Sequence, residues 1–377
     1  MSDAAMLRLS YSAYAYLRGH DPQAGRAAVR EALEFFGMTG TMEWFAVSDD
    51  RHQFNFALMF VFVRTTGSVS EYNVVVRGTN PLSLESWVRE DFEVTTQVPW
   101  PGPGPGGKIS QASATALALH EGLRDHGKSL YESLREHWQT DASLGRETVV
   151  SFTGHSLGGL IAPLLALRLF ETALPGPTVK FDVCSFAAPT AGDQAFASYL
   201  ERSVAGGTGP FGSVRFIRCH DDVAVKVWNR SDMADIGRLY GTYGVPINGF
   251  LATVLAVLRR NVRSLGYAQP FSGTDRSETF PVPRTDVFTL NAFDAEAFLD
   301  GGLQAQFHRA RAVARRQTSP KVFRYTFAWV VQAVVMHILP YAAHLLGQHE
   351  QMYVAETLLR TILTHDTFFV ERRKTPR

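Results

Sequence analysis

A serine stands in the middle of a short glycine-framed motif, Gly154-His155-Ser156-Leu157-Gly158. The motif fits G-x-S-x-G, follows the β-branched run ETVVSFT and precedes the Leu- and Ala-rich run LGGLIAPLLALRLF. A strand, turn and helix in this order force a sharp turn that lifts the hydroxyl clear of a sheet, and glycines are needed where side chains would collide with neighbouring elements. The sequence therefore predicts that Ser156 is a nucleophile. The competing interpretation is a tight turn with an inert serine.

A serine hydroxyl is a weak nucleophile, so it needs a base, a carboxylate that orients the base, and donors for the oxyanion. The backbone N–H of Leu157 comes from the turn itself, where the helix N-terminus also favours negative charge. A second donor should follow an earlier strand. The run VVVRGTN ends at Arg77-Gly78, and Thr79 comes next. We expect Leu157 and Thr79 to form the oxyanion hole; the alternative for Thr79 is an ordinary strand end.

Four sequence blocks around these residues occur in a characteristic order. They are RGT at 77–79, GHSLGG at 154–159, SFAAPTAGD at 185–193 and IRCHDDVAV at 217–225. The set resembles the fungal-type (class 3) lipase family of the α/β-hydrolase superfamily, whose pattern is R-G-T/S, G-H-S-L-G-G, F-x-x-P-x-x-G and D-x-V-P. The resemblance covers about residues 54–228. It supports the same oxyanion pair and implies that residues 80–91 form a lid, with Trp87 as an apolar anchor at a lipid interface.

The carboxylate follows from the last of these blocks. The family pattern D-x-V-P aligns on Asp221, with Ala224 in place of the proline. An aspartate just past the carboxyl end of a parallel strand is well placed for a site residue. Asp222 is the alternative, because the missing proline loosens the register, and either residue could instead be a solvated turn carboxylate.

The base should be a histidine that follows the aspartate in the chain. The resemblance places it shortly before a tyrosine and a short helix, which favours His349 in HEQMYVAETL. His344 is the main alternative. The separation between Asp221 and His349 is longer than in compact members of the family. His155 is adjacent to Ser156 on the turn, so its imidazole cannot easily reach that hydroxyl, and we expect it to pack at the strand end. The remaining candidates are His308, His337 and His365.

The elements that must position these residues alternate between strand and helix through the middle of the chain. Nearly continuous apolar strands of this kind are typical of an α/β fold with a mostly parallel central sheet covered by helices on both faces, here the α/β-hydrolase fold. Residues 1–40 are predicted to be helical up to Gly37, and about 110–137 to form one long helix. The strands are expected at 54–63, 72–80, 147–156, 179–189 and 213–222.

The domain organisation is expected to be simple. We predict a single α/β-hydrolase (lipase) domain over residues 1–377, with an insertion or cap at about 226–340 before the catalytic histidine. PWPGPGPGG at 99–107 is a loop, because four prolines and four glycines exclude a helix or a central strand. The basic stretch 303–316 is expected to be a solvated helix face or a contact with anionic lipid.

Composition excludes several classes of function. Lys and Arg total 37 and Asp and Glu total 36, so a net charge of +1 does not indicate nucleic-acid binding by bulk electrostatics. The two cysteines cannot form a disulfide scaffold or a four-cysteine zinc site. No metal-binding motif and no glycine-rich nucleotide motif occurs in a fitting context, so we expect no metal, no nucleotide and no other cofactor.

The N-terminal segment lacks a signal-peptide pattern, which predicts synthesis in the cytoplasm; non-classical secretion and peripheral membrane association are the alternatives. The stretches 239–258 and 325–349 carry no Asp, Glu, Lys or Arg. Each also contains Pro and other polar or helix-breaking residues, which favours buried or interfacial helices over spanning ones.

These inferences converge on a serine carboxylester hydrolase that cleaves fatty-acyl esters of lipids, of the triacylglycerol lipase or phospholipase A type, through an acyl-enzyme. Its partners would be the lipid or ester substrate and a membrane surface. Two alternatives stay open. One is an acyltransferase or thioesterase with the same triad, and the other is a non-catalytic lipid- or partner-binding protein that kept the fold.

Overall fold

The computed structural model describes residues 1–16, 21–48, 57–78, 94–173, 179–205, 211–220, 222–239, 249–272 and 277–280. Among these, no helix has both the length and the apolar character needed to cross a membrane. The expected basic helix at 303–316 lies outside the described residues, as does most of the expected insertion at 226–340. The division of the chain into one domain with an insertion stays a prediction.

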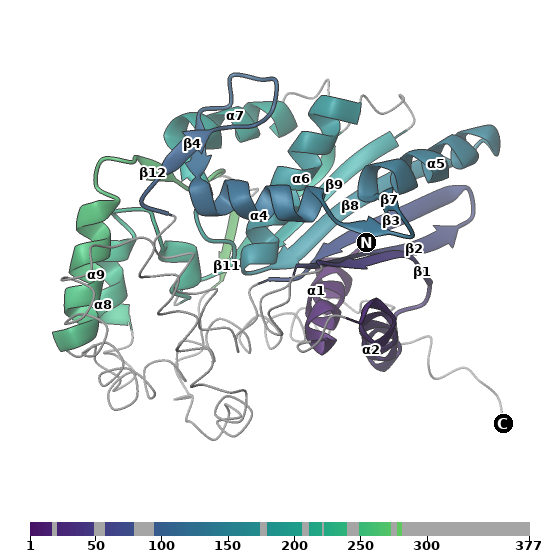
Figure 1. Ribbon diagram of the computed structural model, residues 1–377, viewed down its shortest axis with the longest axis horizontal. Helices are drawn as coiled ribbons and strands as arrows, with labels where there is room; N and C mark the ends of the chain where they lie inside the picture. Colours follow the sequence, from purple (N-terminus) through teal and green to yellow (C-terminus); the bar gives the residue numbers. More distant parts are fainter. Residues whose placement is uncertain are drawn as a thin grey trace.

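A seven-stranded sheet forms the centre of the described structure (Figure 1). Its order is β1-β2-β3-β8-β9-β11-β13. The first three strands pair antiparallel, and each pair from β3 onward is parallel. The α/β fold with a mostly parallel sheet is thus confirmed. The strands are β1 (Thr41–Val47), β2 (Leu58–Thr66), β3 (Val69–Val76), β8 (Glu147–His155), β9 (Val179–Phe186), β11 (Phe211–Cys219) and β13 (Ser277–Phe280).

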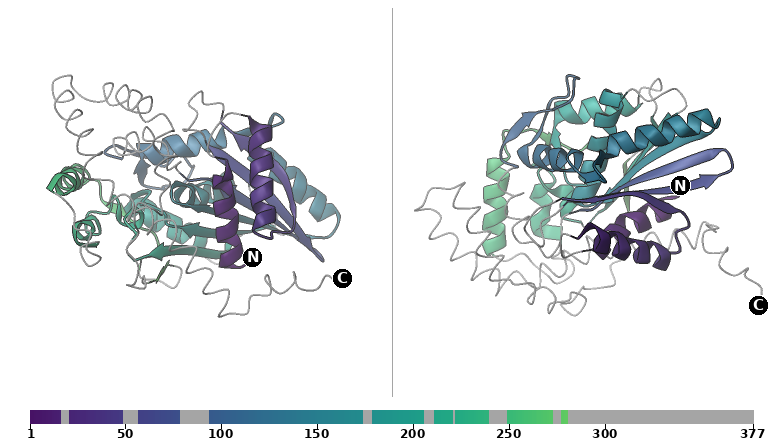
Figure 2. Two further views of the ribbon diagram at one scale, coloured as in Figure 1. Left: turned by 90° about the horizontal axis from the view of Figure 1, so that it is seen from below. Right: turned by 45° about the vertical axis from the view of Figure 1, so that its right-hand side comes forward.

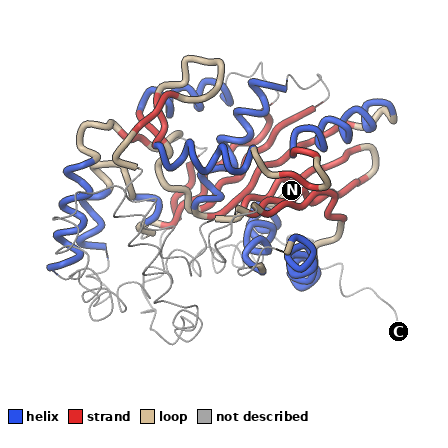
Figure 3. The backbone as a smooth tube through the Cα atoms, in the orientation of Figure 1, coloured by secondary structure: helices blue, strands red, loops and turns tan. Residues whose placement is uncertain are grey.

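Helices cover both faces of this sheet (Figures 1 and 3). One face carries α1 (Asp3–Ser12) and α2 (Pro22–Phe35), which lie side by side in Figure 2. The other face carries α4 (Gln111–Glu121), α5 (Leu130–Ser143), α6 (Leu157–Ala173) and α7 (Gln194–Ala205). Two further helices, α8 (Met233–Leu239) and α9 (Gly249–Asn261), lie at the end of the molecule near β11.

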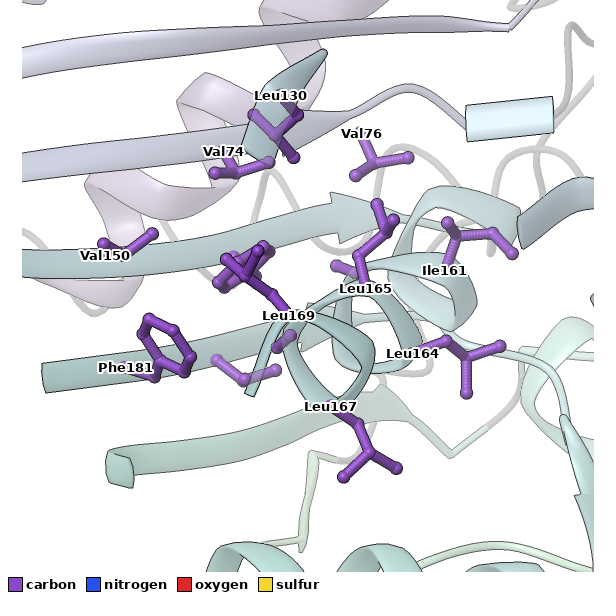
Figure 4. Close-up of a cluster of buried hydrophobic side chains, with 14 of the residues drawn as sticks. Val74, Val76, Leu130, Val150, Ile161, Leu164, Leu165, Leu167, Leu169 and Phe181 are labelled. Carbon is purple, nitrogen blue, oxygen red and sulfur yellow. The ribbon is translucent and has the colours of Figure 1, made fainter. Parts of the chain in front are cut away.

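Alternation along the strands explains why two separate apolar cores form. Successive side chains of a strand point to opposite faces. In β9, Phe181 joins the core beneath α6, whereas Phe186 joins the core beneath α1 and α2. In β8, Val150 and Phe152 are buried on the α6 side. Figure 4 shows this cluster, with Leu165 of α6 among the strand valines. Because both faces are covered, the central strands read as continuous apolar runs.

A smaller four-stranded sheet flanks the main one, in the order β12-β10-β5-β4. The proline- and glycine-rich segment 99–107 connects β4 to β5, as the loop prediction requires. Trp100 in this loop donates its indole N–H to Glu171 of α6, which fixes the loop against the helix. The strands are β4 (Gln97–Pro99), β5 (Lys108–Ser110), β10 (Gly192–Asp193) and β12 (Tyr267–Ala268).

The single long helix expected at about 110–137 is wrong. The chain forms α4, then a hairpin of β6 (Arg124–Asp125) and β7 (Lys128–Ser129), and then α5. Gly122 ends α4, and Gly127 turns the hairpin at φ +83°. Ser129 then starts α5 with a capping box to Glu132. Two glycines and a new N-cap outweigh the apolar periodicity that suggested one helix.

The N-terminal region is helical, as expected, but in pieces. A short 3-10 helix (Ala13–Ala15) follows α1, and α2 ends at Phe35. Gly37 then adopts φ +71°, so the predicted stop at this glycine is confirmed. Strand β1 was not expected. It joins the sheet as an edge strand directly after this turn.

Candidate active site

Ser156 lies between the end of β8 at His155 and the start of α6 at Leu157. Its backbone has φ +59°, a left-handed conformation that non-glycine residues rarely adopt. The strain is held by two backbone hydrogen bonds. The Ser156 N–H donates to the Phe186 carbonyl at 3.0 Å, and the Leu160 N–H donates to the Ser156 carbonyl at 3.1 Å. The predicted strand–turn–helix geometry at the serine is therefore confirmed.

The two glycines of the motif allow this turn to pack against β3. A Cβ on Gly154 would lie 2.4 Å from the backbone of Gly158, and a Cβ on Gly158 would lie 2.2 Å from the Val76 carbonyl oxygen. Both contacts are with backbone atoms, which cannot swing aside. The requirement for glycine at 154 and 158 thus follows from the close approach of β3, β8 and α6.

Gly78 brings the end of β3 against the nucleophile. A Cβ at this position would lie 2.4 Å from the His155 carbonyl oxygen and 3.1 Å from the Ser156 Cβ. The segment that leads to Thr79 therefore passes directly beside Ser156. Thr79 itself lies outside the described residues, whereas Leu157 is partly exposed at the first position of α6.

Strand register collects the expected site segments at one edge of the sheet. Val76 pairs with Gly154, His155 pairs with Phe186, and Phe186 pairs with Ile217. The carboxyl ends of β3, β8, β9 and β11 therefore lie in a row. Site residues of open α/β sheets gather at this edge.

His155 is not oriented as a base for Ser156. It is completely buried, its Nδ1 lies 3.3 Å from the Tyr14 hydroxyl, and its ring packs on Tyr11 with centroids 5.1 Å apart. Both tyrosines come from the N-terminal helical region. The expectation that His155 packs at the strand end is confirmed.

Asp222, the alternative carboxylate, is completely buried just after β11. Its Oδ1 accepts a hydrogen bond from the Ala224 N–H at 2.8 Å, and its own N–H donates to the Cys219 carbonyl at 3.3 Å. It is therefore not a solvated turn carboxylate. Asp221 lies outside the described residues, so the choice between the two aspartates stays a prediction.

A buried amide that sequence reasoning missed ties the segments after β9 and β11 together. Gln269 donates through Nε2 to the carbonyls of Ala188 at 3.2 Å and Val225 at 3.1 Å, and its Oε1 accepts from Arg218 at 3.2 Å. These bonds fix the distance between the segment beside Ser156 and the segment that carries the two aspartates. A glutamine among polar turn residues gives no local signal of this role.

Two buried bases adjoin the same edge. Burial lowers the pKa of Arg77 to about 10, and its Nη1 donates to the Tyr16 carbonyl at 2.8 Å, so the guanidinium stays charged at neutral pH. Burial also lowers the pKa of His120 to about 4, with a smaller contribution from the positive charge of Arg77. His120 is therefore neutral at pH 7. Its Nδ1 lies 2.7 Å from the Ala116 carbonyl, within α4.

Other predicted residues cannot be placed. His349 and its alternative His344 lie outside the described residues, as do His308, His337, His365 and the expected lid at 80–91 with Trp87. Within the described part of the chain, no cluster of His, Cys, Asp or Glu could hold a metal ion. Cys184 and Cys219 are both buried and free.

Residues 73–228 match the family of class 3 lipases, described as "Lipase (class 3)". This central part of the chain is therefore similar to the class 3 lipases. The match indicates a carboxylic ester hydrolase and supports the hydrolysis of lipid esters. The match includes the turn at Gly154–Gly158 that carries Ser156 (the elbow), the segment at Gly78, and the two aspartates Asp221 and Asp222.

Among the similar solved structures, the M37 lipase shares the fold: it is 22% identical, with a TM-score of 0.64 over 82% of this chain and 94% of the other. The lipase of Rhizomucor miehei in complex with its propeptide is 19% identical, with a TM-score of 0.42 over 60% of this chain and 63% of the other. No curated protein sequence matches the chain.

Proposed function

We propose that this protein is a lipase that hydrolyses fatty-acyl esters of triacylglycerols or phospholipids through a covalent acyl-enzyme on Ser156. One observation carries the proposal. Ser156 occupies a left-handed turn at φ +59°, and Gly154, Gly158 and Gly78 are each packed so closely that no side chain fits. Backbone strain of this kind persists only where the surroundings enforce it, and it is concentrated at functional sites.

The proposed mechanism assigns one role to each group. Ser156 attacks the acyl carbonyl while His349 removes the hydroxyl proton, and Asp221 orients and stabilises the resulting imidazolium. The oxyanion is bound by the N–H of Leu157 and by Thr79. His349 then protonates the leaving alcohol, and water attacks the acyl-enzyme to release the fatty acid. The position of Leu157 at the start of α6 and the passage of Gly78 beside Ser156 support this oxyanion pair.

The preference for lipid esters rests on the family and on the segment after Thr79. Residues 80–91 contain Trp87 and apolar residues between polar ones, as a lid that opens at a lipid surface would require. Opening in water would expose apolar surface at a cost, so an interface would favour the open state.

A substrate panel tests this function directly. Hydrolysis of a short p-nitrophenyl ester, a triglyceride emulsion and phospholipid vesicles should be followed for the wild type and Ser156→Ala. We expect the lipid substrates to be hydrolysed and the variant to lose at least about 10⁴-fold in kcat/KM. A variant that keeps wild-type rates would contradict the assignment of Ser156.

Paired variants resolve the two remaining choices. His349→Ala should abolish hydrolysis and His344→Ala should not, and Asp221→Asn should reduce kcat far more than Asp222→Asn. Circular dichroism of each variant distinguishes the loss of a catalytic group from the loss of the fold. Full activity in both histidine variants would show that the base lies elsewhere.

A further inference from the structure

An open groove lies at the outer edge of β1, between α2 and the β6–β7 hairpin. Its volume is about 610 Å³, within the range of sites that hold small ligands or headgroups. The lining combines apolar residues of β1, among them Phe45 and Ala46, with cationic side chains from the helix and the hairpin. It takes no part in the hydrolysis proposed above.

Cationic side chains outnumber the single acid that lines this groove. Arg26 and Arg30 come from α2, one turn apart, and Arg124 and His126 come from the hairpin region. The acid, Asp125, lies 2.6 Å from Nη2 of Arg26 and also accepts the Phe45 N–H at 3.0 Å. Its charge is therefore already balanced.

Two guanidinium groups of the lining, those of Arg30 and Arg124, form no direct ion pair within the described structure. Arg124 donates only to the carbonyls of Glu121 and Leu123, both at 2.8 Å. Arg30 is exposed and forms no ion pair with any described residue. His126 is almost completely exposed, and its Nε2 lies 3.7 Å from Oδ1 of Asp125. Arg124 also lies within electrostatic range of the Glu132 carboxylate. The groove thus offers a net positive charge from two sides, exposed at Arg30 and partly balanced at Arg124.

The groove also lies level with the catalytic edge. Ala46, which lines it, pairs with Met59, Met59 pairs with Val76, and Val76 pairs with Gly154, two residues before the nucleophile. Three strand spacings of about 4.8 Å place the groove roughly 14 Å from this row end at Gly154. A lipid surface that contacts the carboxyl edge of the sheet would therefore also contact a ligand held in the groove.

We propose that this groove binds the phosphate group of an anionic phospholipid and so seats the carboxyl edge of the sheet on a lipid surface. Guanidinium groups form bidentate hydrogen bonds with phosphate oxygens, and two arginines on opposite walls, neither in a direct ion pair, match a phosphate better than a singly charged carboxylate. Pro22 and Ala27 of α2, which line the groove and are exposed, would contact the glycerol and the first acyl carbons.

Vesicle binding tests the proposal on the full chain carrying Ser156→Ala, so that hydrolysis does not consume the lipid. Phosphatidylcholine vesicles containing phosphatidic acid should bind the protein, and the added pair Arg30→Gln and Arg124→Gln should weaken binding about 30-fold. The matched pair Arg202→Gln and Arg238→Gln removes the same charge from α7 and α8 and should leave binding unchanged. Equal weakening by both pairs would overturn the proposal.

Two further arms identify the ligand. Vesicles of equal charge made with a fatty-acid carboxylate should bind more weakly, and equal binding would show a general charge effect and overturn the proposal. Titration with glycerol 3-phosphate tests a soluble source. Tight binding that depends on Arg30 and Arg124, without vesicle binding, would exclude the lipid surface.

The outcome is separable from that of the proposed hydrolysis. On a dissolved p-nitrophenyl ester, the Arg30 and Arg124 variants with Ser156 intact should keep the wild-type kcat/KM. Vesicle binding that fails while ester hydrolysis is normal would overturn the groove proposal and leave the catalytic assignment standing. Vesicle binding that depends on Arg30 and Arg124 in a protein that hydrolyses no ester would overturn the proposed function and leave the groove proposal standing.

Discussion

At the carboxyl edge of the central sheet, Ser156 is held at φ +59° among glycines that tolerate no side chain. At the opposite edge, the buried carboxylate of Asp141 accepts hydrogen bonds from Ser70, Tyr72 and Thr148 at 2.8–3.2 Å. One edge stores strain around a reactive group, and the other satisfies a buried charge completely. Strands β3 and β8 therefore contribute to the proposed site at their carboxyl ends and to stability at their starts.

The Asp141 cluster joins α5 to the beginnings of β3 and β8. Ser70 and Thr148 are paired in the sheet, so one carboxylate bridges both strands. Burial and the hydrogen bond to Asp141 raise the pKa of Tyr72, which keeps its hydroxyl a donor. No comparable set of donors surrounds Ser156 in the described structure.

The largest effect on stability is expected from Asp141→Ala. Removing the carboxylate leaves three buried hydroxyls without their acceptor, which should lower the free energy of unfolding by about 4 kcal/mol. Urea denaturation measures this loss. The kcat/KM of the folded fraction should stay at the wild-type value, and a large loss of activity would show that the two edges are not independent.

Gly158→Ala should affect both stability and catalysis. The new Cβ would meet the Val76 carbonyl at 2.2 Å and push β3, and with it Gly78, away from Ser156. We expect about 3 kcal/mol lower stability and about 100-fold lower kcat. Gly122→Ala, at the end of α4 with its nearest contacts at 3.3 Å, is the matched control and should change little. Wild-type kcat in Gly158→Ala would contradict the close packing of the elbow.

His120 makes the carboxyl edge sensitive to acid. Its pKa of about 4 in the folded state lies below the value of about 6.5 expected when unfolded, so the unfolded chain binds the proton first and stability falls as the pH drops below 6.5. The free energy of unfolding should therefore fall by about 2 kcal/mol less between pH 7 and pH 5 in His120→Gln than in the wild type. An unchanged pH dependence in His120→Gln would contradict the burial of a neutral imidazole.

Tyr72→Phe is expected to have the smallest effect. It removes one hydrogen bond of 2.8 Å to Asp141 and keeps the ring in the core. A hydrogen bond to a charged group contributes about 1.5 kcal/mol or more, so thermal or urea unfolding should show a loss of that order without a change in kcat. A loss as large as that of Asp141→Ala would show that the tyrosine, not the carboxylate, organises the cluster.

Local signals were enough to predict the elbow and the central strands. G-x-S-x-G between a β-branched run and a Leu-rich run encodes the turn, and continuous apolar runs such as that of β8 encode a sheet covered on both faces. The family blocks added the order of the site segments. All of these features depend on residues close together in the sequence.

What sequence reasoning missed depends on contacts between distant segments. Asp141 resembles any solvent-facing acid on a helix, and its role exists only because β3 and β8 start beside it. Gln269 is likewise defined by carbonyls 44 and 81 residues away. Strand β1 has neither an alternating nor a continuous apolar pattern, because only Trp44, Phe45 and Ala46 are buried, in one block. The end of α4 is hard to predict because its apolar periodicity continues past Gly122.

The most direct test of the central claim is to find which residue a fluorophosphonate modifies. The protein should be labelled, digested and analysed by mass spectrometry. The account predicts one stoichiometric adduct on Ser156, formed in parallel with the loss of ester hydrolysis and absent from Ser156→Ala. An adduct on another residue, or full hydrolysis after Ser156 is blocked, would contradict it.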